Sequence, residues 1–131
     1  MYPFLSERWA TELMSELNEN ANYNYLASSW EGDVILSLDK STKWALLELF
    51  HGRCKSVKSS EISDLKPQTP FEFTADLNTW KSLCEGKLSP TIAIATRKLR
   101  VKGDMLQVMR YARATMAMVG STKVIPTRWI N

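Results

Sequence analysis

The sequence predicts a domain that mixes helices with strands, because two hydrophobic periodicities occur in separate stretches. Several short stretches alternate apolar and polar residues, as half-buried strands do, and others repeat apolar residues every three or four positions, as helices do. The 131 residues, 44% hydrophobic and 24% charged, are typical of a globular protein with its own core. We therefore treat 1–131 as one domain, with an N-terminal helical segment (1–30) and a C-terminal tail (119–131).

The chain begins with a predicted helix from Ser6 to about Asn18. Ser6 is a favourable N-cap, and Trp9, Leu13 and Leu17 form one apolar stripe at helical spacing. The following residues, up to position 29, are rich in Asn and Tyr. This stretch either extends the helix or forms a loop.

Four strands are expected next, at Val34–Leu38, Lys43–Phe50, Arg53–Ser59 and Phe71–Thr74. His51-Gly52 is a turn between the second and third, and the third is polar enough to lie near a sheet edge. The second strand is apolar on both faces, which indicates a strand that is covered on both sides or lines a cavity.

Three signals for the ends of helices then follow one another. Asp76 is expected to cap a helix that carries Trp80 and Leu83 on one side. Gly86 stands where a helix C-cap belongs, because glycine enters the left-handed conformation without a Cβ clash. Ser89-Pro90 is typical of an N-cap followed by the first residue of another helix.

A fifth strand and a last helix are predicted after that. Leu99 and Val101 alternate with basic residues, Gly103 turns the chain, and Asp104 caps a helix running to about Met118. Its apolar stripe is rich in methionine, which adapts to irregular or changing partners but most often is plain core. The stripe consists of Met105, Val108, Met109, Ala112 and Met116.

Charge is distributed unevenly along the chain. The net charge is +3, yet from Thr96 onward eight basic residues face one acidic residue, and the preceding part is net acidic. A basic end of this kind suits an anionic membrane, the anionic head of a ligand, or nucleic acid. The tail from Gly120 either folds over the domain or lies on a surface.

The sequence contains no recognisable catalytic or metal-binding pattern. His51 is the lone histidine and stands beside a turn glycine, Cys54 and Cys84 lack metal-ligand spacing, and no phosphate-binding glycine loop occurs. We therefore expect no enzyme activity, no metal and no cofactor. No apolar run reaches membrane-spanning length and the start lacks the pattern of a signal peptide, so a cytoplasmic location is expected.

Residues 76–111 resemble the sterol carrier protein 2 (SCP2) lipid-binding domain family. That family carries a capped helix ending in Leu-x-x-Gly-Lys-Leu-x-Pro, then Gly-Lys-Leu-x-[Val/Ile]-x-Gly-[Asp/Asn]-Met and an amphipathic helix. Arg97 stands where the family usually has the first glycine of the second motif. The matching residues are Leu83, Gly86, Lys87, Leu88, Pro90, Lys98, Leu99, Val101, Gly103, Asp104 and Met105.

The resemblance implies an α+β fold with a five-stranded, mainly antiparallel sheet covered by helices that enclose an apolar tunnel. Such domains bind sterols, fatty acids, acyl-CoAs or other lipids without a cofactor. The predicted lipid-binding residues are Trp44, Leu46, Phe50, Phe73, Trp80, Leu83, Met105, Met109 and Met116. The predicted contacts to an anionic head or a membrane are Arg97, Arg100 and Arg110.

Two hypotheses therefore remain besides a lipid carrier that touches anionic membranes transiently. One is a regulatory or assembly domain that keeps the fold and has a filled tunnel. The other, nucleic-acid binding, is disfavoured because the basic end lacks interleaved aromatic residues for base stacking. The sequence leaves the oligomeric state, monomer or homodimer, undecided.

Overall fold

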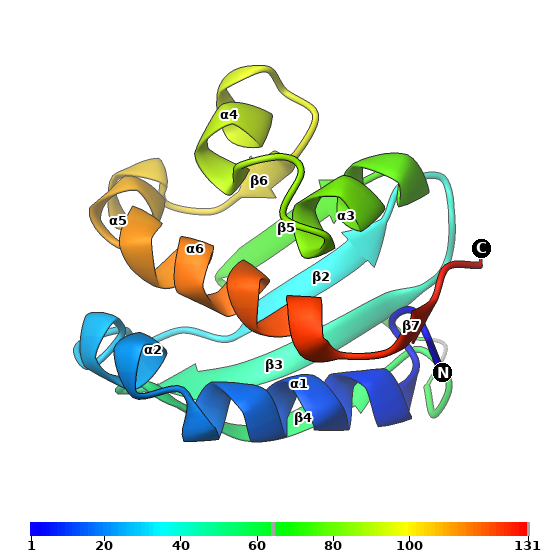
Figure 1. Ribbon diagram of the computed structural model, residues 1–131, viewed down its shortest axis with the longest axis horizontal. Helices are drawn as coiled ribbons and strands as arrows, with labels where there is room; N and C mark the ends of the chain where they lie inside the picture. The colour runs from blue at the N-terminus through cyan, green and yellow to red at the C-terminus, as the bar shows by residue number, and fades with distance from the viewer. Residues whose placement is uncertain (64, 131) are drawn as a thin grey trace.

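The fold is built on a five-stranded sheet with the strand order β4-β3-β2-β5-β6 (Figure 1). The computed structural model describes residues 1–63 and 65–130. The β2 and β5 strands run parallel and the other neighbours antiparallel, so the expected α+β, mainly antiparallel sheet is confirmed. Its strands are β2 (Val34–Leu38), β3 (Trp44–Phe50), β4 (Arg53–Ser59), β5 (Phe71–Ala75) and β6 (Arg100–Lys102).

The two faces of the sheet have separate apolar clusters, because successive side chains of a strand point to opposite faces. Val34 and Leu36 of β2 belong to the main core beneath the helices. Ile35 instead joins Trp44 and Leu46 in a small buried cluster. The central strands are thus covered on both sides, one of the two situations that the apolar pattern of β3 predicted.

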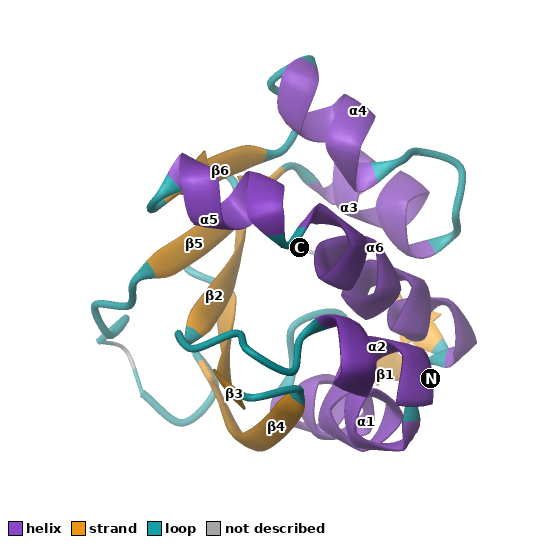
Figure 2. Ribbon diagram, turned by 90° about the vertical axis from the view of Figure 1, so that its left-hand side faces the viewer, coloured by secondary structure: helices purple, strands orange, loops and turns teal. Residues whose placement is uncertain are grey.

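Helices pack on one face of the sheet, and the connection between β4 and β5 runs on the other side (Figure 2). Two further short helices, α4 and α5, lie at the end of the sheet near β6 (Figure 1). The helices are α1 (Glu7–Glu19), α2 (Ala21–Leu26), α3 (Leu77–Cys84), α4 (Pro90–Ala95), α5 (Met105–Arg110) and α6 (Ala112–Ser121). No helix of the described residues is long and apolar enough to cross a membrane.

The N-terminal segment forms two helices joined at Asn20. Ser6 Oγ accepts a hydrogen bond from Trp9 N at 3.1 Å, which confirms the predicted cap of α1. Asn20 ends α1, and its side chain accepts from Tyr23 N at 3.0 Å to begin α2. Asn20, in the stretch for which the sequence left helix and loop open, therefore ends one helix and caps the next.

Most of the other predicted end signals also act as expected. Asp76 accepts from Thr79 N at 2.7 Å, and Asp104 accepts from Leu106 N at 3.0 Å. Gly86 has φ 77°, in the left-handed region. Ser89 precedes Pro90 at the start of α4 but makes no capping hydrogen bond through its side chain.

The last helix is not continuous, in contrast to the prediction of one helix from Asp104 to Met118. It breaks at Tyr111, which has φ −104° and ψ 28° and separates α5 from α6. The Tyr111 ring meets Trp30 edge to face with centroids 5.0 Å apart, and its hydroxyl lies 2.6 Å from Ser29 Oγ. These contacts with a distant segment change the direction of a chain that local periodicity would continue as a helix.

The C-terminal tail folds over the domain. After a 3-10 turn, η1 (Thr122–Val124), β7 (Thr127–Arg128) pairs in parallel with β1 (Tyr2–Pro3). Trp129 packs against Phe4 with ring centroids 4.7 Å apart. Strands of two residues are too short to show a periodic pattern, so the sequence did not predict this pairing.

Arg97 adopts a conformation that favours glycine. Its φ is 61°, and the resemblance described above implies glycine at this position. For a residue with a Cβ the left-handed conformation costs about 1–2 kcal/mol. A strained arginine therefore holds the turn before β6.

We expect Arg97→Gly to stabilise the protein. Relief of strain is partly offset by about 0.5–1 kcal/mol for the flexibility of glycine, so the unfolding free energy should rise by up to about 1.5 kcal/mol. Chemical denaturation measures the change, with Arg97→Ala as the control because it removes the side chain and keeps the strain. A glycine variant less stable than the alanine variant would contradict the prediction.

Candidate functional site

An apolar groove of about 300 Å³ lies between α4 and the α5–α6 pair. No charged residue lines it. The α4 sequence, Pro-Thr-Ile-Ala-Ile-Ala, supplies one wall without a charge, and the methionine-rich start of α5 supplies the other. The lining residues are Pro90, Thr91, Ile94, Ala95, Met105, Val108, Met109, Ala112 and Thr115.

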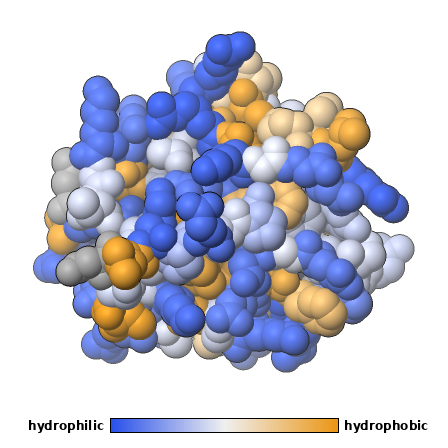
Figure 3. Space-filling view, turned by 180° about the vertical axis from the view of Figure 1, so that it is seen from behind, coloured by the Kyte–Doolittle hydropathy of each residue, from blue (hydrophilic) through white to orange (hydrophobic). Residues whose placement is uncertain are grey.

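Large apolar side chains surround the groove and remain exposed. Seen from behind, apolar atoms gather over α4 and α5 (Figure 3). Leu106 is 81% exposed, Met109 70% and Ile92 56%. Such a concentration of exposed apolar side chains marks an interaction site more often than a scattered single residue does.

A second, inner crevice lies between α6, α2 and the sheet, but it is nearly closed. Its volume is about 20 Å³, enough for about one water molecule. Thr115 lines both this crevice and the outer groove, so the two spaces adjoin. The crevice is lined by Tyr23, Ala27, Trp30, Val34, Leu49, Phe73, Tyr111, Ala114, Thr115 and Met118.

Tyr111 connects the inner crevice with the break in the last helix. It lines the crevice and stands at the break between α5, which carries the groove methionines, and α6. Its ring leans on Trp30, which in turn packs on Phe71 at 4.6 Å between centroids. The contact of its hydroxyl with Ser29 ties this ring to the segment after α2.

The predicted lining residues separate into groups. Met105 and Met109 lie in the outer groove, and Phe73 lies in the inner crevice. Trp80 and Leu83 are buried in the main core, where Trp80 Nε1 donates to the Ser37 carbonyl oxygen at 2.9 Å.

The structure corrects the expected position of the four other residues. Trp44 and Leu46 lie on the opposite face of the sheet, because their alternation in β3 points them away from the helices. Phe50 is 40% exposed at the end of β3, and its ring stacks on that of His51 with the ring centroids 3.9 Å apart. Met116 is 47% exposed and is not among the residues that line the groove.

The sequence did not predict the α4 wall of the groove or the role of Tyr111 at the break between α5 and α6. It did not select Ile94 or Ala95, although the uncharged stretch of α4 carried a signal that could have found them. Val108 and Ala112 were placed on the apolar stripe but not named as lining residues. Nothing local distinguished Tyr111, because its partners are far away in the sequence.

The three predicted basic contacts do not converge. Arg97 and Arg100 line a different hollow, of about 430 Å³, beside α3. There Arg100 Nη2 donates to Asp39 Oδ1 at 2.6 Å, so its charge is already paired. Arg110 lies on α5, with its guanidinium 5.9 Å from the centre of the Tyr111 ring.

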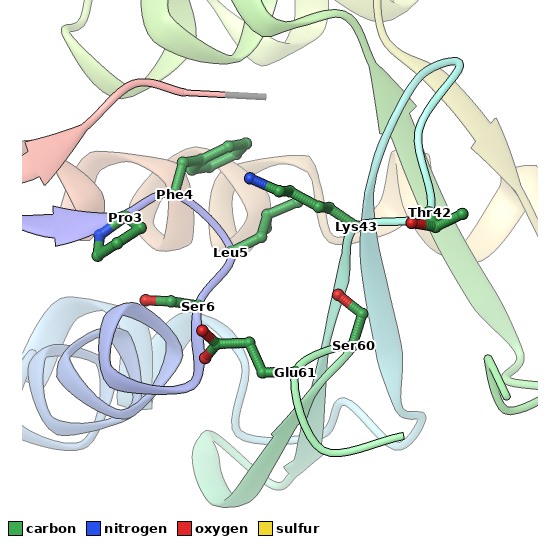
Figure 4. Close-up of a pocket in the computed structure, with 8 residues that line it drawn as sticks. All are labelled: Pro3, Phe4, Leu5, Ser6, Thr42, Lys43, Ser60 and Glu61. Carbon is green, nitrogen blue, oxygen red and sulfur yellow. The ribbon is translucent and has the colours of Figure 1, made fainter. Parts of the chain in front are cut away.

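Another hollow, of about 450 Å³, lies where the N-terminal segment meets the β2–β3 turn and the end of β4 (Figure 4). Glu61 is on one side, and its Oε1 accepts from the backbone N of Glu7 at 2.6 Å. Lys43 extends over the opposite side toward Phe4 (Figure 4). The Glu61 carboxylate thus holds the start of α1, and the lining of this hollow lacks the apolar continuity of the groove.

Comparison with known families shows to which family the chain belongs. The profile of the SCP-2 sterol transfer family matches residues 12–115. The chain belongs to this family. A search of curated proteins gave no match.

Solved structures of the family agree with the assignment. A crystal structure of sterol carrier protein 2 is 29% identical, with a TM-score of 0.84 over 92% of this chain and 98% of its own. A conserved hypothetical protein from Thermus thermophilus, described as a candidate sterol carrier protein, is 28% identical, with a TM-score of 0.83 over 98% and 93%. Sterol carrier protein 2 from Yarrowia lipolytica in its apo form, at 20% identity, a TM-score of 0.58 and coverage of 87% and 88%, shares the fold.

The SCP2 fold of this chain keeps its thiols away from solvent. Burial raises the pKa of Cys54 to about 12 and that of Cys84 to about 11. His51 lies at an exposed turn, with Nε2 2.7 Å from Glu31 Oε1. Among the described residues no group of three or more His, Cys, Asp or Glu side chains could hold a metal ion.

We expect the two thiols to be unreactive in the folded protein. A thiol-specific disulfide reagent at about pH 8 should label both only after denaturation, because the thiolate is the reactive form. Since folding raises both pKa values, the unfolding free energy should fall as the pH rises above about 9, where the unfolded thiols ionise first. Rapid labelling of the native protein would contradict this.

Proposed function

We propose that this SCP2-family chain binds the hydrocarbon part of a lipid in the groove between α4 and α5–α6, without catalysing a reaction. The observation that carries the proposal is the uncharged lining of the 300 Å³ groove. The family assignment supports lipid binding in general. The ligand class is a fatty acid, a fatty acyl-CoA or a sterol, and exposed Arg110 nearby favours one with an anionic head.

Apolar burial supplies the favourable free energy for such binding. Each buried methylene contributes about 0.8 kcal/mol, so about ten contribute roughly 8 kcal/mol. Association costs of about 4–15 kcal/mol offset part or all of this, so a useful affinity requires a long buried chain. The groove is at the small end of ligand sites, which span about 300–1,000 Å³.

A longer alkyl chain would therefore extend into the inner crevice. This needs Tyr111 to move, because the crevice holds only about 20 Å³ as the side chains stand. The methionines around the groove suit such a change, since they are unbranched and adapt their shape. We take Tyr111 and Ser29 as a latch between the two spaces.

The closed crevice also favours the alternative, a regulatory or assembly domain with a filled interior. Native mass spectrometry of the purified protein separates the two functions. Lipid that co-purifies, or a fatty acid that binds on addition, supports the lipid-binding function. A chain that stays empty in both measurements supports the alternative.

Filling the groove should abolish binding. Ala112→Trp places a large ring in the groove, and we expect the dissociation constant of a fluorescent fatty acid to rise at least about tenfold, equivalent to about 1.4 kcal/mol. Ala21→Trp, on an exposed helix position, is the matched control and should bind like the unmodified protein. Equal binding by Ala112→Trp would refute the groove as the site.

Loosening the latch should change rates more than affinity. Tyr111→Phe removes the hydroxyl that contacts Ser29 and keeps the ring against Trp30. We expect stopped-flow fluorescence to show faster association and faster dissociation of the fatty acid, with the dissociation constant altered by less than about fivefold. Ser29→Ala should give the same change, and the double variant should add nothing, since both remove one interaction.

A further inference from the structure

We propose that the hollow beside α3 binds the phosphate group of a small phosphorylated molecule. This space, which we call the α3 hollow, has a volume of about 430 Å³, and ligand sites span about 300–1,000 Å³. It is separate from the apolar groove, because none of the described residues lines both spaces. Most residues around it carry a charged or polar side chain.

The sheet topology brings the walls of the α3 hollow together. The β2 and β5 strands run parallel in register, so both end at the same edge of the sheet. Asp39 follows the first strand and Asp76 the second, and α3 begins directly after Asp76. The β6 strand runs antiparallel to β5, so its start, Arg100, lies at this edge as well. Three separate parts of the sequence therefore meet in the hollow.

The end of α4 turns a basic segment into the α3 hollow. Lys98 N donates to the Ala93 carbonyl oxygen at 2.9 Å, and Arg97 N donates to that of Ile94 at 3.1 Å. With Arg97 in the left-handed conformation, these two bonds form a Schellman motif, which ends the helix and reverses the chain. Arg97, Lys98 and Arg100 all line the hollow as a result.

The two acidic side chains of the hollow already have partners. Asp39 Oδ1 accepts a hydrogen bond from Arg100 Nη2 at 2.6 Å, and Asp76 Oδ1 accepts one from Thr79 N at 2.7 Å. The bond from Thr79 N is the main cause that lowers the pKa of the Asp76 carboxyl, so this cap stays ionised at neutral pH. Neither carboxylate is free to take up the remaining basic charges.

Two cations of the α3 hollow are available to a ligand. Arg97 and Lys98 are exposed, and neither forms an ion pair with a carboxylate in the part of the chain that the structure describes. Asn78 and Ser82 lie four residues apart on α3 and add an amide and a hydroxyl to the same lining. A guanidinium binds phosphate oxygens through two parallel N–H···O bonds, and an ammonium adds a point charge.

The backbone of Arg97 supports a role for its side chain. Glycine adopts the left-handed conformation freely, whereas a residue with a Cβ is strained there. Strained residues are concentrated at ligand sites, where the surrounding structure holds them in place. Binding of an anion by the guanidinium gives a reason for an arginine at a position that glycine would occupy with less strain.

Isothermal titration calorimetry with inorganic pyrophosphate tests the proposal. At about 0.1 M salt the unmodified chain should bind this probe with a dissociation constant below about 1 mM. Arg97→Gln with Lys98→Gln should weaken binding at least about tenfold, because charge-assisted hydrogen bonds are lost. Arg97→Gly should also bind more weakly although we expect it to be more stable, which separates the role of the side chain from the stability of the fold.

The matched control is Lys55→Gln with Lys58→Gln on β4, which removes the same charge from another exposed place. It should change the dissociation constant by less than about twofold. Equal losses from both pairs would overturn the proposal, since they would indicate attraction by net charge alone. Pyrophosphate should also raise the denaturation midpoint of the unmodified chain but not that of the Arg97→Gln, Lys98→Gln variant, because only a native state with the site is stabilised.

Removing an acidic partner should have the opposite effect. Asp39→Asn removes a negative charge from the α3 hollow and frees Arg100, so pyrophosphate should bind about fivefold more tightly. Glu19→Gln at the exposed end of α1 is the matched control for this charge. An Asp39→Asn variant that binds no more tightly than Glu19→Gln would overturn the assignment of the site to this hollow.

Decyl phosphate distinguishes two sources of the phosphate group. If it binds no more tightly than pyrophosphate, and Ala112→Trp leaves both affinities unchanged, the hollow serves a free phosphorylated molecule. If it binds more tightly, and both Ala112→Trp and Arg97→Gln abolish the gain, the hollow holds the head of a molecule whose alkyl chain lies in the groove. Both results support the phosphate site.

Fatty-acid binding separates this proposal from the proposed function. Pyrophosphate binding by a protein that binds no fatty acid supports the phosphate site while the groove function fails. Fatty-acid binding by a protein that binds neither pyrophosphate nor decyl phosphate through Arg97 and Lys98 overturns the phosphate site and leaves the groove function intact.

Discussion

The contact of Tyr111 with Trp30 and Ser29 determines how the C-terminal third of the chain is arranged. Without it the apolar stripe from Met105 to Met116 would favour one helix laid on the sheet. With it, α6 stays on the sheet while α5 turns toward α4 and leaves Met105 and Met109 facing an open groove. The edge-to-face rings and the hydroxyl contact are short-range interactions, but they decide which apolar side chains become core and which become surface.

The apolar space of this protein is thus divided rather than continuous. The region between α6 and the sheet is packed to within about 20 Å³, whereas the groove outside it holds about 300 Å³. Packing of this density stabilises the fold and leaves room for a guest only if side chains move. Thr115 lines both spaces, so they adjoin at this residue. The enclosed tunnel that the family resemblance implied stays a prediction.

Acidic and basic residues are distributed unevenly over the helices. The α1 helix is acidic, whereas α4, α5 and α6 carry no acidic residue, as the basic C-terminal part of the sequence indicated. The structure shows that this part is not one surface. Arg100 is paired with Asp39 in another hollow, and only Arg110 of the three predicted arginines lies on the helices of the groove.

The local signals by themselves determined the order of the helices and strands. Helix caps and strand alternation act over a few residues, so the sequence predicts them; examples are the caps Ser6, Asp76 and Asp104 and the alternation of β2 and β3. The resemblance to the SCP2 family predicted the five-stranded, mainly antiparallel sheet. Which face of β3 meets the helices, where the last helix breaks and which methionines stay exposed depend on contacts between residues far apart in the chain. Trp44 and Phe73 are equally apolar in the sequence, and only the register and direction of their strands place one behind the sheet and the other beside the crevice.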